Sequence, residues 1–194
     1  MAEATRINLT NQFLIAMPGM ADPMFAGSVV YLCEHSEQGA LGLVINKPVD
    51  IKLKNLFEKV ELSLTRDDLA EAPVYFGGPV QTERGFVLHE RQGEGTSPYN
   101  STLAIADSGL EMTTSKDVLE ALAGGAGPRR VLVTLGYSGW EAGQLEDEIG
   151  RNGWLTVGAD PAVIFDTPTD KRYDRALSLL GIDPRMLSQE AGHA

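Results

Sequence analysis

The chain has 194 residues and a mass of 20.9 kDa, and 43% of its residues are hydrophobic while 22% are charged. These values are ordinary for a soluble globular protein and exclude wholesale disorder. Sixteen Lys and Arg residues stand against 27 Asp and Glu residues, which gives a net charge of −11 and a pI near 4.7. A surface this acidic repels phosphate and anionic lipid, so we expect no direct binding to nucleic acid or membrane.

The cysteine content and the N-terminal segment both indicate a cytoplasmic protein. Cys33 is the one cysteine in the sequence, so no disulfide forms within the chain, and a reducing compartment is expected. The apolar run at 13–17 is cut by Pro18-Gly19 and is shorter than the core of a signal peptide. No stretch approaches the roughly 18 consecutive apolar residues that cross a bilayer.

The first half of the chain predicts mostly strands. An apolar strand is expected at 13–17, and two β-branched or apolar runs at 28–34 and 41–45 form the clearest hairpin, with its turn at Gln38-Gly39. Apolar residues at helical spacing then predict a helix over 53–59. After a second helix start at Thr65, further strands are expected at 74–76, 85–89 and 102–106.

The second half alternates helices and strands. Ser115 is expected to cap a helix that ends near Leu122, and the other expected elements are a strand at 130–135, a helix at 139–151, strands at 154–157 and 162–165, and a helix at 170–180. The pattern predicts an α/β protein with a mixed sheet. We expect a single domain over 1–194, with an ordered core at about 10–187 and a loose tail at 188–194.

Three blocks of sequence occur in the order typical of a known family. The first holds residues 13–20, 31–35 and 39–48; the second is Phe76-Gly77-Gly78-Pro79-Val80; the third joins Gly136-Tyr137-Ser138-Gly139-Trp140 to Gln144-Leu145-Glu146 and Trp154. Through these blocks the chain resembles the bacterial AlgH/YqgE family over roughly residues 10–185. The resemblance implies a cytosolic protein with a large mixed sheet, a smaller α+β portion packed on it, and a proposed regulatory link to alginate production. It supplies no catalytic residues.

Cys33 is the first candidate for chemistry. It stands two residues before His35, and on a regular strand the two side chains face the same way. A thiol beside an imidazole, from His35 or from His89, can ionise and act as a nucleophile or redox sensor. The alternative is a small buried side chain inside a strand, which is the usual environment of cysteine.

A metal site is not expected. The sequence has three histidines, and only Cys33, His35 and His89 offer a ligand set outside the tail. No Cys-x-x-Cys and no close pair of ligands on a helix is present, so neither a metal nor any other cofactor is predicted.

The segment Gly136-Tyr137-Ser138-Gly139 is predicted to connect a strand to a helix. Such a turn can expose a serine nucleophile, but no glycine stands two residues after Ser138 and the histidine that follows, His193, lies in the tail. It can also hold an anionic cofactor through the amides of Gly136, Ser138 and Gly139, although Glu141 would repel an anion there. We favour a structural turn in which Ser138 caps the helix.

Two further features receive structural interpretations. Gly77-Gly78 is expected to let the backbone pass close to another segment. Trp140 and Trp154 are expected to hold the ends of the 139–151 helix on the sheet, with a partner surface as the alternative.

The sequence therefore favours a regulatory or interaction module without turnover, which binds a protein partner or a small ligand. The alternative is a thiol-dependent enzyme or redox sensor at Cys33 with a nearby histidine. The difference between them lies in the surroundings of Cys33: apolar neighbours favour the first and a histidine beside an open cavity favours the second.

Overall fold

A computed structural model of the chain describes residues 7–183, so the tail predicted at 188–194 lies outside the described residues. Within that range the strands are β1 (Gln12–Ala16), β2 (Val29–Ser36), β3 (Gly39–Val44), β4 (Pro48–Lys52), β5 (Pro73–Phe76), β6 (Val80–Glu90), β7 (Thr102–Ile105), β8 (Leu110–Thr113), β9 (Val131–Glu141) and β10 (Trp154–Gly158). The helices are α1 (Leu53–Lys59), α2 (Asp67–Ala70), α3 (Lys116–Ala123), α4 (Gln144–Gly150), α5 (Pro161–Phe165) and α6 (Arg172–Leu179), with a 3-10 turn, η1 (Thr169–Lys171), before α6.

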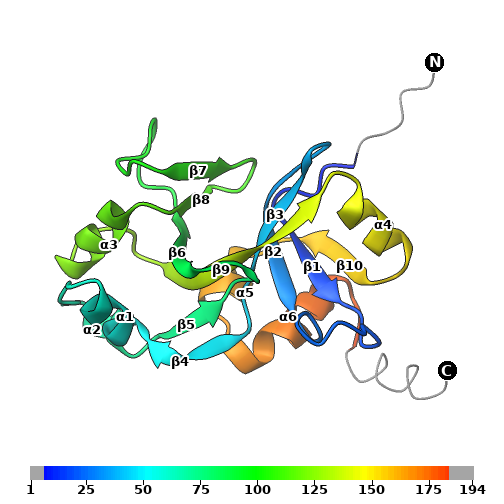
Figure 1. Cartoon of the computed structure of the whole chain (residues 1–194), viewed down its shortest axis with the longest axis horizontal. Helices are drawn as coiled ribbons and strands as arrows, with labels where there is room; N and C mark the ends of the chain where they lie inside the picture. Colours follow the sequence, from blue (N-terminus) through cyan, green and yellow to red (C-terminus); the bar gives the residue numbers. More distant parts are fainter. Residues whose placement is uncertain (1–6, 184–194) are drawn as a thin grey trace.

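The described strands form one curled sheet in the order β10-β1-β2-β3-β9-β6-β8-β7, with β4 and β5 branching from β9 (Figure 1). The pairing is antiparallel except between β5 and β9, which run parallel. The sheet is therefore mixed, and the predicted α/β class is confirmed.

Strand β9 joins the two halves of this sheet. Its end at 138–141 pairs with β3, while its first part pairs with β6 and, at Thr134 and Leu135, with β5. One half carries β1–β3, β10 and α4–α6, and the other carries β4–β8 and α1–α3 (Figure 1). The second half corresponds to the smaller α+β portion that the resemblance implies.

Three clusters of buried apolar side chains hold the layers together. The main cluster contains residues of both halves, from Tyr31 and Cys33 in β2 to Leu88 in β6 and Leu177 in α6. A second cluster lies on the other face of β1–β3, beneath α4. The third lies between the sheet and helices α1–α3, so each face of the sheet is covered by helices.

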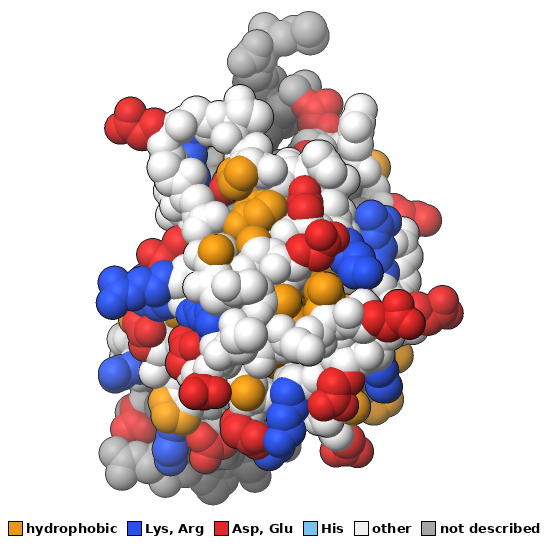
Figure 2. Space-filling view, turned by 90° about the vertical axis from the view of Figure 1, so that its left-hand side faces the viewer, with side chains coloured by type: hydrophobic (Ala, Val, Ile, Leu, Met, Phe, Trp, Pro, Cys, Tyr) orange, Lys and Arg blue, Asp and Glu red, His pale blue; other side chains and the backbone are white. Residues whose placement is uncertain are grey.

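The end of the molecule that carries α1–α3 shows scattered charges of both signs around exposed hydrophobic side chains (Figure 2). A groove there is lined by Leu56 of α1, Leu119 of α3 and Val133 of β9, among others.

No helix within residues 7–183 is long and apolar enough to cross a membrane.

Several predictions from the sequence are confirmed. The hairpin of β2 and β3 turns at 37–38, and α1 covers the predicted residues 53–59. The close approach expected at Gly77-Gly78 is present, because a side chain on Gly78 would lie 2.2 Å from the backbone of Tyr137. The two glycine-containing blocks of the sequence therefore pack backbone against backbone.

The predicted helix at 139–151 is wrong in its first third. β9 continues to Glu141, and the helix α4 begins at Gln144 after Gly143, whose φ is +78°. The pairing of Ala40 with Trp140 and of Gly42 with Ser138 extends the strand, so hydrogen bonding to β3 overrides the local helical pattern.

The strand predicted at 162–165 is also wrong, because this run is the helix α5. Asp160 caps it by accepting a hydrogen bond from the Ala162 amide at 3.0 Å, and Pro161 occupies its first position. Strands β4 and β8 were not predicted.

Candidate functional site

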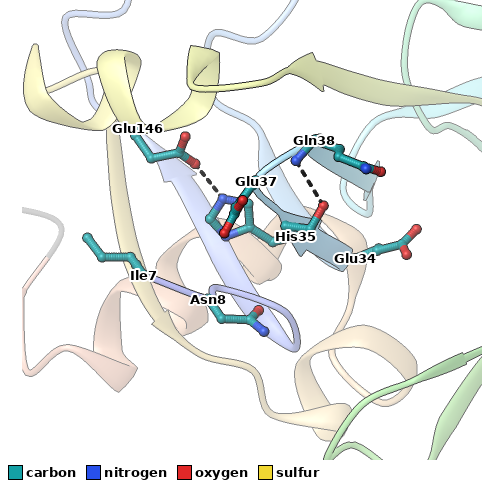
Figure 3. Close-up of a pocket in the computed structure, with 8 residues that line it drawn as sticks. Ile7, Asn8, Glu34, His35, Glu37, Gln38 and Glu146 are labelled. Atoms are coloured by element: carbon teal, nitrogen blue, oxygen red, sulfur yellow. Dashed lines mark hydrogen bonds and ion pairs between the residues drawn. The ribbon is translucent and has the colours of Figure 1, made fainter. Parts of the chain in front are cut away.

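A cavity of about 720 Å³ opens where the end of β2, the β2–β3 turn and α4 meet (Figure 3). Its described lining is polar or charged at every position except Ile7. The lining residues are Ile7, Asn8, Glu34, His35, Ser36, Glu37, Gln38 and Glu146. His35 of the first sequence block and Glu146 of the third meet in this lining.

A bulge in β2 determines which side chain faces this cavity. The register with β3 shifts between Leu32 and Glu34, so Cys33 is the extra residue. Cys33 joins the main core with Tyr31, whereas His35 contacts Leu9 and α4 on the opposite face. The expectation that Cys33 and His35 share a face is therefore wrong, because it assumed a regular strand.

Both ring nitrogens of His35 are engaged. Its Nδ1 accepts a hydrogen bond from the backbone N–H of Leu9 at 2.9 Å, so that nitrogen carries no proton. The proton of the neutral ring is therefore on Nε2, which donates to Oε1 of Glu146 (Figure 3). In this arrangement both ring nitrogens are occupied, and the imidazole links β2 to the Leu9 backbone and to Glu146 of α4.

The described lining of the cavity is acidic. Three carboxylates line it, from Glu34, Glu37 and Glu146, and no Lys or Arg stands among its described lining residues. The side chain of Glu146 is 40% exposed while that of His35 is 2% exposed, so the carboxylate faces the opening and the imidazole lies behind it. A site of this charge attracts cations.

Cys33 does not line this cavity, and among the described contacts it hydrogen bonds to neither candidate histidine. Its side chain is 1% exposed, and its Sγ donates to the carbonyl oxygen of Tyr31 at 3.8 Å. Burial raises the pKa of the thiol, and the nearby Glu34 charge raises it further. Within residues 7–183 neither His35 nor His89 hydrogen bonds to it, so the structure does not bring the thiol candidates together.

We expect Cys33 to react slowly in the folded protein, because the thiolate is the reactive form and burial disfavours it. The rate of alkylation by iodoacetamide should be at least about 100-fold below that of a free thiol at the same pH and should recover in urea. A rate near that of a free thiol, rising below pH 8, would support thiol chemistry instead.

His89 lies in the other half of the sheet, on β6. Its Nδ1 donates to the carbonyl oxygen of Glu90 at 2.9 Å, so Nε2 is unprotonated and accepts from the hydroxyl of Thr113 at 2.7 Å. Thr113 in turn bonds to Thr102 at 2.9 Å. His89 is fully buried, and this burial lowers the pKa of its imidazole. His89 is therefore a buried neutral histidine held in one tautomer.

The lowered pKa of His89 predicts loss of stability in mild acid. On acidification the unfolded chain binds the proton first, so the free energy of unfolding should fall as the pH drops below about 6.5 and level off at the lower folded pKa. Urea unfolding midpoints between pH 8 and pH 5 measure this. A His89→Asn variant keeps a donor for the Glu90 carbonyl and should show a shallower slope; equal slopes would contradict the assignment.

The glycine-and-serine segment does not form a strand-to-helix turn. Gly136, Ser138 and Gly139 all lie inside β9, and no helix begins there to hold an anion. Ser138 is fully buried and donates to the carbonyl oxygen of Gly77 at 3.0 Å. The interpretation of Ser138 as a helix cap is therefore wrong, and its hydroxyl instead joins the two glycine-containing blocks.

Within the described residues no three His, Cys, Asp or Glu side chains are grouped as metal ligands. The candidate residue that the sequence did not indicate is Glu146, which stands 111 positions from His35. One feature of the sequence could have indicated this pair: His35 and Glu146 both lie in the blocks that carry the family resemblance.

Comparisons with known proteins agree with that resemblance. A model of an AlgH-like family matches residues 13–185. A UPF0301 protein of Ralstonia nicotianae is 68% identical over 188 residues, which cover 97% of this chain and 96% of the relative. A UPF0301 protein of Burkholderia cenocepacia is 68% identical over 189 residues, or 97% of each chain.

Two solved structures have the same fold. The solution structure of the AlgH protein from Pseudomonas aeruginosa matches with a TM-score of 0.77 and 49% identity over 100% of both chains. A crystal structure of protein DIP2367 from Corynebacterium diphtheriae matches with a TM-score of 0.68 and 21% identity, covering 90% of this chain and 88% of the other.

Proposed function

The chain belongs to the AlgH-like family, and from that premise we propose that it is a cytoplasmic regulatory or interaction module without turnover. Its ligand is a positively charged group, presented by a protein partner or a small molecule, that enters the cavity beside His35 and Glu146. The membership confirms the resemblance seen in the three sequence blocks.

One observation carries this proposal: the cavity combines an acidic lining with a histidine that has no vacant nitrogen. The Leu9 amide and the Glu146 carboxylate occupy both nitrogens of His35, which argues against proton transfer. The lining carboxylates supply charge for a cation, and a net charge of −11 steers basic partners toward the protein.

The direct test is binding of a tetra-arginine peptide at low salt, measured by calorimetry or NMR. We expect saturable binding that weakens with salt, and Glu146→Gln should lower the affinity about five- to ten-fold because one attractive charge is removed. Glu141→Gln is the matched control, since Glu141 is an exposed carboxylate at the end of β9 outside the cavity lining.

Equal loss of affinity in the Glu141 and Glu146 variants would show only nonspecific attraction to an acidic surface, and absence of saturable binding would overturn the proposal. The thiol-dependent alternative has its own test in the alkylation of Cys33.

A further inference from the structure

A second cavity, of about 290 Å³, opens on the other side of α4 and is walled by aromatic rings. Phe25 lies 5.7 Å from Trp154 and 6.3 Å from Trp140, and the two indole rings are 6.2 Å apart, all between ring centroids. Phe25 and Met20 are half-buried and form the rim, whereas both indoles are buried behind them. Three rings therefore surround one opening.

A carboxylate, from Glu148, also lines this cavity. Oε1 of Glu148 accepts hydrogen bonds from the indole N–H of Trp140 at 3.1 Å and of Trp154 at 3.0 Å. Its other oxygen accepts from the side-chain amide of Gln144 at 2.9 Å. Because three N–H donors already bind it, Glu148 offers a ligand its negative charge more than hydrogen-bonding capacity.

The remaining charges of the lining also favour a cation. Asp22 adds a second carboxylate at the rim. Arg151, the basic residue among the described lining, has its charge offset by Asp147, with 3.2 Å between Nε and the carboxylate oxygen. Aromatic rings attract cations through their electron-rich faces, most strongly for Trp.

We propose that this cavity binds a small quaternary ammonium group. Such a cation needs no hydrogen-bond acceptor, so it suits a carboxylate whose oxygens are occupied, and its methyl groups contact the rings of Phe25 and the two tryptophans. The site is separate from the cavity at His35, since α4 lies between them and they have no described lining residue in common.

The test uses the fluorescence of the full chain, because its two tryptophans both line this cavity. Choline is titrated at constant ionic strength beside 3,3-dimethyl-1-butanol, which has the same shape without the charge. We expect a saturable change in tryptophan emission with choline and at least about ten-fold weaker binding of the neutral analogue.

Variants locate the site. Phe25→Leu should weaken choline binding at least about five-fold, since it removes a ring from the rim, whereas Phe165→Leu, a half-buried phenylalanine of α5, should leave it unchanged. Glu148→Gln keeps an acceptor oxygen for the indoles but removes the charge, and should weaken binding similarly. If this variant does not fold, the Phe25 variant decides.

Three outcomes would overturn the proposal: no saturable response, equal binding of the neutral analogue, or unchanged affinity in the Phe25→Leu variant. A choline affinity that falls with Glu146→Gln and not with Phe25→Leu would place the cation in the first cavity instead. Failure here leaves the tetra-arginine result unaffected, because that result depends on Glu146.

Discussion

Replacing Gly136 by Ala is expected to lower the free energy of unfolding by more than about 4 kcal/mol, or to prevent folding. Gly136 has a φ of +77°, and a Cβ there would lie 2.4 Å from the carbonyl oxygen of Gly78 and 3.0 Å from that of Val80. Both neighbours are backbone atoms. Val80 is paired with Tyr137 of β9, and Gly78 lies in the close approach between the two glycine-containing blocks, so neither can move aside without disturbing the packing of these blocks. Urea unfolding of the purified variant measures the loss.

Gly85→Ala is the matched control for this prediction. Gly85 lies in β6, directly paired with β9, but has no heavy atom within 4 Å of its Cβ position and no positive φ. Its substitution should change stability by less than about 1 kcal/mol. A similar effect at both positions would show that the close approach at Gly136 is not what limits stability.

The second large effect is expected at His35. His35→Ala should lower the free energy of unfolding by about 3 kcal/mol, because it leaves the Leu9 amide without its acceptor, breaks the tie to Glu146 and opens a cavity under α4. Leu145 is the one fully buried residue of helix α4, so the position of this helix depends more on hydrogen bonds such as that between His35 and Glu146 than on apolar contact. Urea unfolding and amide exchange of α4 report the two consequences.

His35→Asn separates these contributions. The Asn carbonyl oxygen takes the place of Nδ1 and can accept from Leu9, while the contact with Glu146 is lost. We expect this variant to recover roughly half of the stability lost in His35→Ala. If the Asn and Ala variants are equally unstable, the bond to Leu9 contributes nothing and the assigned tautomer is wrong.

The sequence predicted those elements whose signals are local. The β2–β3 hairpin follows from β-branched runs around a glycine turn, and α1 follows from Leu53, Leu56 and Phe57 at helical spacing. Residues 139–141 were predicted as the start of a helix, but they pair with β3, nearly 100 residues earlier in the chain, and so extend β9 instead. The apolar run at 162–165 is compatible with a strand or a helix, and the preceding Asp160-Pro161, which is typical of a helix N-terminus, predicts the helix that is observed.

The candidate site was predictable in part. His35 was recognised, but it was placed beside Cys33 because a bulge in β2 cannot be read from residue order. The partnership of His35 with Glu146 depends on how α4 docks over the sheet, which is tertiary information. The environment of Glu148 is tertiary information too, because the two indoles that donate to it come from β9 and β10.

The order of strands also has a consequence for synthesis on the ribosome. The outer partners of the β1–β3 meander are β9 and β10, which come from residues 131–158. Both edge strands of this early three-stranded sheet, β1 and β3, therefore remain unpaired on one side until β9 and β10 have left the exit tunnel. Unpaired edge strands promote aggregation between nascent chains. The growing polypeptide should thus depend on holding chaperones most during the interval before its closing strands emerge.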